Sequence, residues 1–290
     1  MNPLGNPTLR LFIGAALISL SPVWVKLVSV SPTASGFYRV LIGGGALVLY
    51  LALTRRSLEL SRRSLAILML SATFFAMDLW FWHRSIGYVG PGLATLLGNF
   101  QVFFMILAGA VLLHQRPHAR QLVAVPLALG GLALLVGLDW SALPADYQLG
   151  IVFGLLTAAT YAGYLLTLRE VRTRSAYRSP VREVAVVSMA TAFLLGMTAA
   201  MEGTSLVIPT LADAGWLLSY GILSHCIGWL LIAGALTRVS ATEAGLALLL
   251  QPALSFVWDV LFFARPVTLI EWMGAVIVLL AIYLGSVKNE

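Results

Sequence analysis

Polar and aromatic side chains gather in a few apolar stretches of this sequence. The densest stretch, residues 74–84, contains Asp78, Trp82 and His83. Asp78 and Trp82 are four residues apart, so a helix would place them on one face. A carboxylate beside an indole ring favours binding of an ammonium group, through ion pairing and cation–π attraction. The alternative for this stretch is an aromatic belt at a membrane interface, where Trp is common.

Further apolar stretches carry polar or aromatic residues in stripes at helical spacing. These candidate site residues are Trp24, Asn99, Gln101, Tyr161, Tyr164, His225, Trp229, Gln251 and Trp258. Polar groups inside a bilayer are costly, so they tend to face the bundle interior or a wet cavity. Each stripe is also explained by helix packing with interhelical hydrogen bonds, which average about 0.6 kcal/mol. The recurrence of such stripes on several helices predicts a small-molecule binding site.

A few charged residues and one proline leave two interpretations open. Arg39 either pairs with an acidic side chain that fixes the fold or binds a substrate carboxylate. Lys26 either reaches the membrane surface with its ammonium group or contributes to binding. Pro22 either kinks its helix or frees backbone carbonyls for a ligand. Trp80 and Arg84 share a face, and we assign them to the interfacial belt.

Sequence motifs for other functions are absent. The chain has no G-x-x-x-x-G-K-[ST] for ATP, no H-E-x-x-H and no G-x-S-x-G, so neither an ATP motor nor a common hydrolase is predicted. Ser224 and His225 are sequence neighbours and diverge by about 100° on a helix, which argues against a nucleophile–base pair. The histidines lack metal-ligand spacing. We therefore expect no cofactor, no metal and no enzymatic activity.

The composition excludes a soluble domain. Of the 290 residues 60% are hydrophobic and only 10% are charged, against about 25% charged in a typical soluble domain. The mean hydropathy is +0.92, which also excludes disorder. A single cysteine, Cys226, excludes a disulfide framework. The formal charge is +6, but the basic residues lie between apolar runs, so we expect a lipid bilayer as partner and no nucleic acid.

Apolar runs of membrane-spanning length fill most of the chain. A helix needs about 20 apolar residues to cross the hydrocarbon core. Ten such runs are predicted, at residues 9–28, 33–54, 64–83, 91–113, 119–138, 147–169, 181–201, 212–236, 241–264 and 267–287. The runs are continuously apolar rather than alternating, which argues against a β-barrel. The fold class predicted is an all-α membrane protein with ten transmembrane helices.

The positions of Lys and Arg predict the orientation. With ten spans both termini share a side, and most of the basic residues fall in the connections on that side. The connections 139–146 and 202–213 contain no Lys or Arg. Basic loops stay in the cytoplasm, so both termini are predicted to be cytoplasmic. The compact loops suit a bacterial inner membrane.

The two halves of the chain repeat weakly. A shift of 150 residues places Gln101 on Gln251 without gaps and Arg116 beside Pro266. We divide the chain into a first five-helix repeat, residues 1–140, and a second repeat, residues 141–290. An odd number of spans inverts the second half in the membrane. Inverted repeats commonly build alternating-access transporters with the substrate near the midplane.

The sequence resembles the EamA type of the drug/metabolite transporter superfamily over its whole length. The resemblance is carried by the first residues of the second span and by the segments around the ninth span. The matching segments are Ser31-Pro32 followed by Arg39, residues 236–241, Gln251-Pro252 and Arg265-Pro266. The glutamate that is frequent after the fourth and ninth helices in this family is absent from both places in this sequence. Among its members, the aromatic-rich spans three, six and eight are most similar to bacterial aromatic amino acid exporters.

The resemblance implies a transporter that exports small metabolites, with amino acids, aromatic ones included, as substrates. A nucleotide-sugar or drug carrier of the same superfamily is the alternative, but phosphates would favour paired basic residues. An intramembrane enzyme is a further alternative. Proton exchange would need a titrating group, and the candidates are Asp78, His83, Glu243 and Asp259.

Overall fold

The chain folds into a bundle of membrane-length helices. The computed structural model describes residues 6–55, 60–112, 114, 116–137, 139–174, 181–235, 238–239 and 241–286. Nine segments in these ranges are long and apolar enough to cross a bilayer, and Ala247–Phe263 adds a shorter apolar helix. Within the described ranges every regular element is a helix. The prediction of an all-α, ten-helix membrane protein is confirmed.

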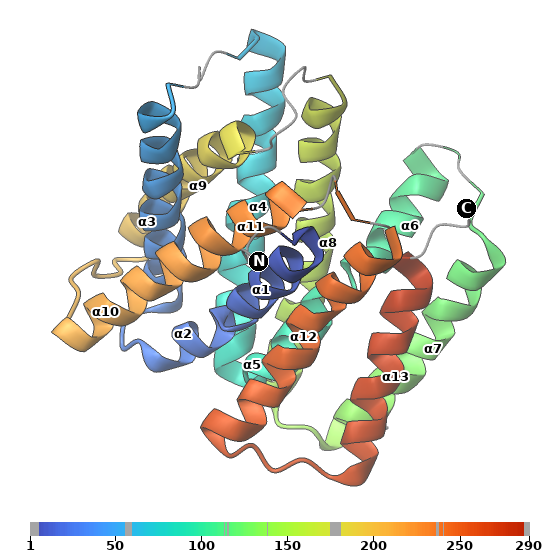
Figure 1. Ribbon diagram of the computed structural model, residues 1–290. Helices are drawn as coiled ribbons and strands as arrows, with labels where there is room; N and C mark the ends of the chain where they lie inside the picture. The colour runs from blue at the N-terminus through green and yellow to red at the C-terminus, as the bar shows by residue number, and fades with distance from the viewer. Residues whose placement is uncertain are drawn as a thin grey trace.

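The helices run in chain order as the hydropathy pattern predicts (Figure 1). The first half contains α1 (Pro7–Ser19), α2 (Ser21–Leu27), α3 (Pro32–Leu53), α4 (Arg62–Val89), α5 (Pro91–Gly98), α6 (Gln101–Leu112) and α7 (Ala119–Val136). The second half contains α8 (Ala145–Arg174), α9 (Val181–Met201), α10 (Leu211–Ser219), the π-helix η3 (Tyr220–Gly228), α11 (Trp229–Ala235), α12 (Ala241–Phe263) and α13 (Leu269–Ser286), and the short 3₁₀-helix η2 (Trp140–Ala142) links the halves.

Helix ends follow local backbone chemistry. The Ser31-Pro32 pair opens α3 because the Ser31 hydroxyl accepts the Ala34 N–H and the proline occupies the first turn, where no N–H is needed. The third predicted span ends at residue 83, but α4 continues to Val89. It ends where Gly90 takes a positive φ of 86° before Pro91, a conformation that glycine adopts without steric cost.

Three membrane segments are interrupted within the bilayer. The first breaks at Leu20, because Pro22 has no N–H to donate to the turn before it. The fourth breaks at Asn99 and Phe100, between α5 and α6. The eighth widens into the π-helix η3. Irregular backbone at membrane depth is tolerated only where protein or water satisfies it, and it often marks a functional site.

Helix packing shows the two-repeat architecture. The helices that correspond in the two halves pack on each other: α3 on α9, α5 on α12, and α7 on α13 (Figure 1). The other large helix contacts also match when each helix is replaced by its counterpart in the other half. Packing of α4 on α8 corresponds to packing of η3 and α11 on α1, and packing of α3 on η3 corresponds to that of α9 on α4. An inverted repeat with a pseudo-two-fold axis has this property.

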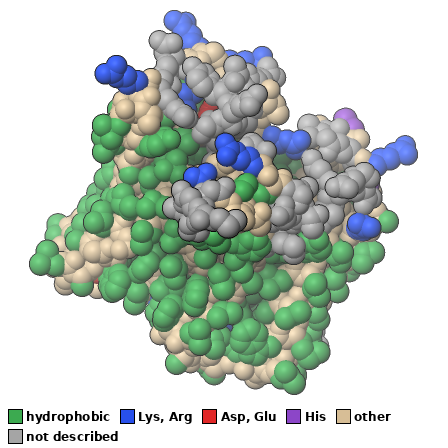
Figure 2. Space-filling view, viewed as in Figure 1, with side chains coloured by type: hydrophobic (Ala, Val, Ile, Leu, Met, Phe, Trp, Pro, Cys, Tyr) green, Lys and Arg blue, Asp and Glu red, His purple; other side chains and the backbone are tan. Residues whose placement is uncertain are grey.

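The molecular surface separates charge from apolar area. In Figure 2, Lys and Arg side chains gather toward one end of the visible face, and hydrophobic side chains cover the middle and the opposite end. The basic end is where α3 ends, α4 begins and α7 begins (Figure 1). Leu, Val, Met and Phe side chains that are more than half exposed, such as Leu122, Phe193 and Leu280, lie against lipid in a multi-pass membrane protein.

Glycines set the closest helix crossings. A Cβ on Gly131 of α7 would lie 2.9 Å from the Gly274 carbonyl oxygen of α13, and a Cβ on Gly274 would lie 2.7 Å from the Gly131 oxygen. Gly43 of α3 is similarly closed by the ring of His225 and the Gly221 carbonyl. Close backbone approach at small residues drives helix association in membranes.

Replacing Gly131 with alanine should destabilise the protein by about 1–3 kcal/mol, because two backbones must separate to admit the methyl group. Thermal unfolding in detergent measures this loss. Gly130 is the matched control on the same helix, since a Cβ there meets nothing within 4 Å. Gly130→Ala should leave the melting temperature unchanged or slightly higher. Equal effects of the two substitutions would contradict the crossing.

Candidate functional site

A buried chain of hydrogen bonds links α3, η3 and α4. Arg39 Nη1 of α3 donates to the Tyr220 hydroxyl of η3 at 3.0 Å, and this hydroxyl lies 3.3 Å from His83 Nε2 of α4. His83 Nδ1 is 2.6 Å from the Leu79 carbonyl oxygen, so Nδ1 carries the proton and Nε2 accepts from Tyr220. The chain fixes the tautomer of His83 and joins three helices.

Arg39 also lies against two aromatic rings. Its guanidinium carbon is 5.1 Å from the Tyr220 ring centroid and 5.5 Å from that of Trp82, within the range of cation–π attraction. An acidic partner for Arg39 is not found among the described residues. Neither of the two predicted roles of Arg39, a structural ion pair or binding of a substrate carboxylate, is settled by these contacts, and both stay predictions. The Nε atom of Arg39 is buried and has no hydrogen-bond partner in the described part of the chain.

Aromatic rings continue the cluster across α4 and α8. Phe75 stacks on Tyr164 with centroids 4.6 Å apart, and Tyr164 stacks on Tyr161 at 5.5 Å. On its other side Phe75 lies 6.2 Å from the His225 ring. His225 Nε2 is 2.8 Å from the Ser188 hydroxyl of α9, but its Nδ1 is buried and unpartnered within the described ranges. The rings form a continuous wall beside Arg39.

Asp78 adds a carboxyl group to the cluster. The residue is 6% exposed, and its carboxylate forms no hydrogen bond or ion pair with any described residue. Arg39, Tyr161 and Tyr164 are close enough to interact with it electrostatically. A buried carboxylate without a partner is costly in a protein, so this group is a strong candidate for ligand or proton binding.

We define the central cluster by the residues that this geometry brings together. They are Arg39, Phe75, Asp78, Trp82, His83, Tyr161, Tyr164, Ser188, Tyr220 and His225. Six of these were predicted as site residues. Tyr220 belongs to the stripe of His225 and could have been selected for its place in the π-helix. Ser188 gave no signal, because a lone serine in an apolar helix is ordinary.

Trp24 and Trp258 lie apart from this chain in a second hydrogen-bonded group. Trp24 Nε1 donates to Ser224 Oγ at 3.3 Å, and Trp258 Nε1 donates to Ser19 Oγ at 2.9 Å. Ser255 Oγ donates to the Ser19 carbonyl at 2.9 Å. This carbonyl is among those that the break before Pro22 releases from the helix, so α12 satisfies it. Both indole N–H groups thus have protein partners, and substrate contact by the rings stays a prediction.

The predicted amide residues differ in their partners. Asn99 Nδ2 donates to the Thr95 carbonyl at 2.8 Å and so stabilises the break between α5 and α6. Gln101 Oε1 is buried and has no described partner. Gln251 and Trp229 are half-buried on α12 and α11, and contact of these four side chains with a substrate stays a prediction.

One end of the bundle is closed by a network around Glu202. Its carboxylate accepts hydrogen bonds from Thr33, from Trp80 Nε1 and from Arg84 Nη2, each at 2.7 Å. The Arg84 guanidinium lies 3.7 Å from the Trp80 ring centroid. The network joins α3, α4 and the end of α9. It places Trp80 and Arg84 outside the central cluster, in line with their assignment to the interface.

A second network closes the same end between α4, α5 and α12. The Asp259 carboxylate accepts from the Gly92 N–H at 3.0 Å and pairs with Arg265 at 3.3 Å. Gly90 is required beside it, because a Cβ there would lie 2.9 Å from Asp259 Oδ2. Asp259 is 2% exposed, so its charge is stabilised by these partners rather than by water.

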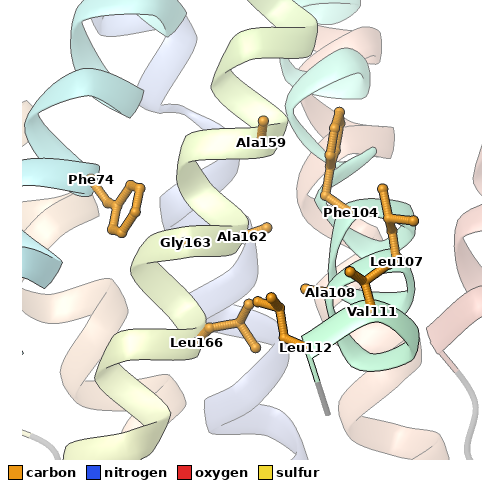
Figure 3. Close-up of a pocket in the computed structure, with 10 residues that line it drawn as sticks. All are labelled: Phe74, Phe104, Leu107, Ala108, Val111, Leu112, Ala159, Ala162, Gly163 and Leu166. Carbon is orange, nitrogen blue, oxygen red and sulfur yellow. The ribbon is translucent and has the colours of Figure 1, made fainter. Parts of the chain in front are cut away.

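A cavity of about 390 Å³ lies elsewhere, between α4, α6 and α8. Figure 3 shows Phe74 of α4 on one side and Phe104, Leu107 and Val111 of α6 on the other, with α8 between them. All ten lining residues are apolar or glycine. The cavity therefore offers no polar side chain, and none of its lining residues belongs to the central cluster.

Metal binding has no support in the described ranges. No group of three or more His, Cys, Asp or Glu side chains there is placed to hold a metal ion.

Comparison with known proteins extends over nearly the whole chain. The family model for the EamA-like transporter family matches residues 8–137 and 148–287. The chain is 26% identical over 247 residues to the pseudopaline exporter CntI of Pseudomonas aeruginosa strain UCBPP-PA14, covering 84% of this chain and 82% of that protein. It is 27% identical over 260 residues to the uncharacterized transporter YwfM of Bacillus subtilis strain 168, covering 89% and 85%. A crystal structure shares the fold with a TM-score of 0.68 and 16% identity, over 96% of this chain and 97% of that one.

Tyr220→Phe should lower stability by about 1–3 kcal/mol, because it removes the hydroxyl that satisfies both Arg39 Nη1 and His83 Nε2. Thermal unfolding of the purified protein measures the loss. Tyr283→Phe is the control, since its hydroxyl has no described hydrogen bond. An unchanged melting temperature for Tyr220→Phe would show that the chain contributes nothing to stability.

The Glu202 network should make stability depend on pH. Burial raises the pKa of Glu202, but the hydrogen bonds from Thr33 and Trp80 and the charge of Arg84 lower it more, so the pKa lies below its usual 4.5. The carboxylate therefore stabilises the fold above pH 4.5 and loses this effect as pH falls through its lowered pKa. The difference in melting temperature between wild type and Glu202→Gln should shrink on acidification. A difference that is constant with pH would contradict an ionised Glu202 in this network.

Proposed function

Since the chain belongs to the EamA-like transporter family, we propose that it exports small metabolites from the cytoplasm, with amino acids, aromatic ones among them, as substrates. The central cluster is the proposed binding site. The two halves would open it alternately to either side of the membrane, as in other transporters built from inverted repeats.

The observation that carries this proposal is a pair of opposite charges without ion-pair partners. Arg39 and Asp78 lie on neighbouring helices of the central cluster, and neither forms an ion pair with a described residue. An amino acid carries a carboxylate and an ammonium group within one small molecule. The guanidinium of Arg39 suits the carboxylate, and the Asp78 carboxylate suits the ammonium group. A zwitterion would therefore neutralise both buried charges at once.

The aromatic wall supports an apolar or aromatic side chain on the substrate. Trp82 lies against the Arg39 guanidinium, and the stacked rings of Tyr161 and Tyr164 interact electrostatically with Asp78. Rings attract other rings in offset or edge-on arrangements worth about 0.5–1.5 kcal/mol beyond area burial. A nucleotide sugar fits less well, because Arg39 is the single basic side chain of the cluster and phosphates favour paired cations.

The geometry also argues for transport over catalysis. Ser188 and His225 have the spacing of a nucleophile and a base. However, His225 Nδ1 lacks a described partner that would orient the ring, and Ser188 is 0% exposed. Nucleophile–base pairs normally need such an orienting group and access to substrate. We therefore assign this pair to helix packing around Gly43.

Alternating access requires that each end of the bundle can open. The Glu202 and Asp259 networks seal one end, and the basic side chains gather at the other. Basic residues mark the cytoplasmic side in an inner membrane, so we assign the sealed end to the outside and both termini to the cytoplasm. Breaks in the first and fourth segments and the π-helix of the eighth lie where bending would open a path.

Counterflow of radiolabelled L-phenylalanine into liposomes that contain only this protein tests the proposal. Unlabelled L-phenylalanine should compete. 3-Phenylpropionate lacks the ammonium group and 2-phenylethylamine lacks the carboxylate, so both should compete poorly. Arg39→Gln should reduce transport roughly tenfold to a hundredfold, the value of one charge-assisted hydrogen bond. The exposed Arg63→Gln is the matched control. Absence of any amino acid counterflow, or equal competition by all three compounds, would exclude the proposed site.

A further inference from the structure

We propose that Asp78 is also a proton-binding site, so that the protein exchanges one substrate molecule for a proton. This inference rests on the proposed function, because the substrate ammonium group and the proton compete for the same carboxylate. The sequence offers four titrating candidates inside the spans, and their partners in the structure separate them.

Asp259 is fully engaged. Its carboxylate accepts the Gly92 N–H and pairs with Arg265, which is also 3.9 Å from Glu271. Protonation would leave the Arg265 charge without its nearest partner. We therefore assign Asp259 a structural role.

His83 is held neutral by its neighbours. Its Nδ1 already donates to the Leu79 carbonyl, and its Nε2 accepts from Tyr220, which accepts from Arg39. A proton on Nε2 would turn the Tyr220 hydroxyl away from its acceptor and place a second positive charge beside Arg39. His225 is a further histidine in the same field, stacked on Phe75 with no carboxylate in contact. Neither ring has a partner that would stabilise an imidazolium. The side chain of Glu243, the fourth candidate, lies outside the described residues.

Asp78 differs because two opposing effects act on its carboxyl group. Burial without a hydrogen-bond donor favours the neutral acid, whereas the nearby Arg39 favours the carboxylate. The titratable groups that interact with it are Arg39 from α3, Tyr161 and Tyr164 from α8 and Tyr220 from η3. The helix α2 also packs on α4, and it carries Lys26 in its last turn. The sequence of α5 contains no titratable residue, and α9 brings its Arg182 and Glu183 only at its first turn. A ligand cation at Asp78 tips this balance.

The exchange step then conserves charge and protons. With the site open to the cytoplasm, the ammonium group of the substrate pairs with Asp78, and the acid proton passes to cytoplasmic water. With the site open to the outside, the substrate leaves and Asp78 takes a proton from external water. One zwitterion moves out and one proton moves in. One positive charge therefore enters the cell in each cycle, so a pH gradient and an inside-negative potential both drive export.

Proton release on substrate binding tests this directly. Purified wild-type protein in weak buffer with a pH indicator should release up to about one proton per bound L-phenylalanine. Release should decline as the starting pH is raised, because Asp78 is then already ionised. Asp78→Asn should release none, and Asp139→Asn, on the exposed loop before α8, should behave as wild type. Binding is measured in parallel by calorimetry in two buffers of different ionisation enthalpy.

The outcomes separate the two proposals. Failure of wild type to bind phenylalanine would overturn the proposed function. Binding without proton release at any pH would leave that function standing and overturn the antiport. If Asp78→Asn does not fold, wild-type liposomes decide: net efflux of L-phenylalanine should then acidify the lumen, and an imposed inside-negative potential should speed net export from right-side-out vesicles. Net export that is indifferent to both gradients would exclude proton exchange.

Discussion

Hydrocarbon offers no hydrogen bonds, and this constraint shapes every polar group in the bundle. A buried donor or acceptor must find a partner within the protein or remain at a cost of several kcal/mol. Most polar side chains here meet the requirement with a neighbouring helix. Glu202 collects three donors, and the carbonyl released by the break before Pro22 is taken by Ser255. Such groups hold helices together.

Three of the exceptions lie together, although Ser21, Ser35, Gln101 and Thr157 outside the central cluster also have an unpartnered buried oxygen in the described ranges. Arg39 Nε, His225 Nδ1 and the Asp78 carboxylate have no described partner, and all three belong to the central cluster. A core with only a structural role could be built from apolar side chains, which would fill the same space without the cost of desolvating polar groups. A ligand with complementary charges gives these groups a reason to be there. The same balance that leaves Asp78 open to an ammonium group leaves it open to a proton, which ties substrate movement to proton movement.

Hydropathy alone predicted the number of membrane segments, because length and apolarity are local properties of the sequence. The break in the first segment lies just before Pro22, for which a kink was one of the two interpretations, whereas the break at Asn99 was not predicted. Which polar stripes come into contact depends on which helices pack on each other, and a single sequence does not show that. The sequence left open whether Arg39 pairs with an acidic side chain or with a substrate, and in the structure Arg39 donates to Tyr220 of the π-helix. Trp24 and Trp258 resemble ligand contacts in sequence, yet their indole N–H groups are bonded to serines of neighbouring helices. The packing of α3 against η3 places Arg39 beside Tyr220, and Arg39 has no ion-pair partner among the described residues.

The most direct measurement is an experimental structure of the protein with L-phenylalanine bound. The account predicts the amino acid in the central cluster, with its carboxylate within hydrogen-bond distance of the Arg39 guanidinium and its ammonium group on the Asp78 carboxylate. Its ring should lie against Trp82 or the tyrosines of α8. An amino acid bound in the apolar cavity between α6 and α8, or one that leaves Arg39 and Asp78 without contact, would contradict the account.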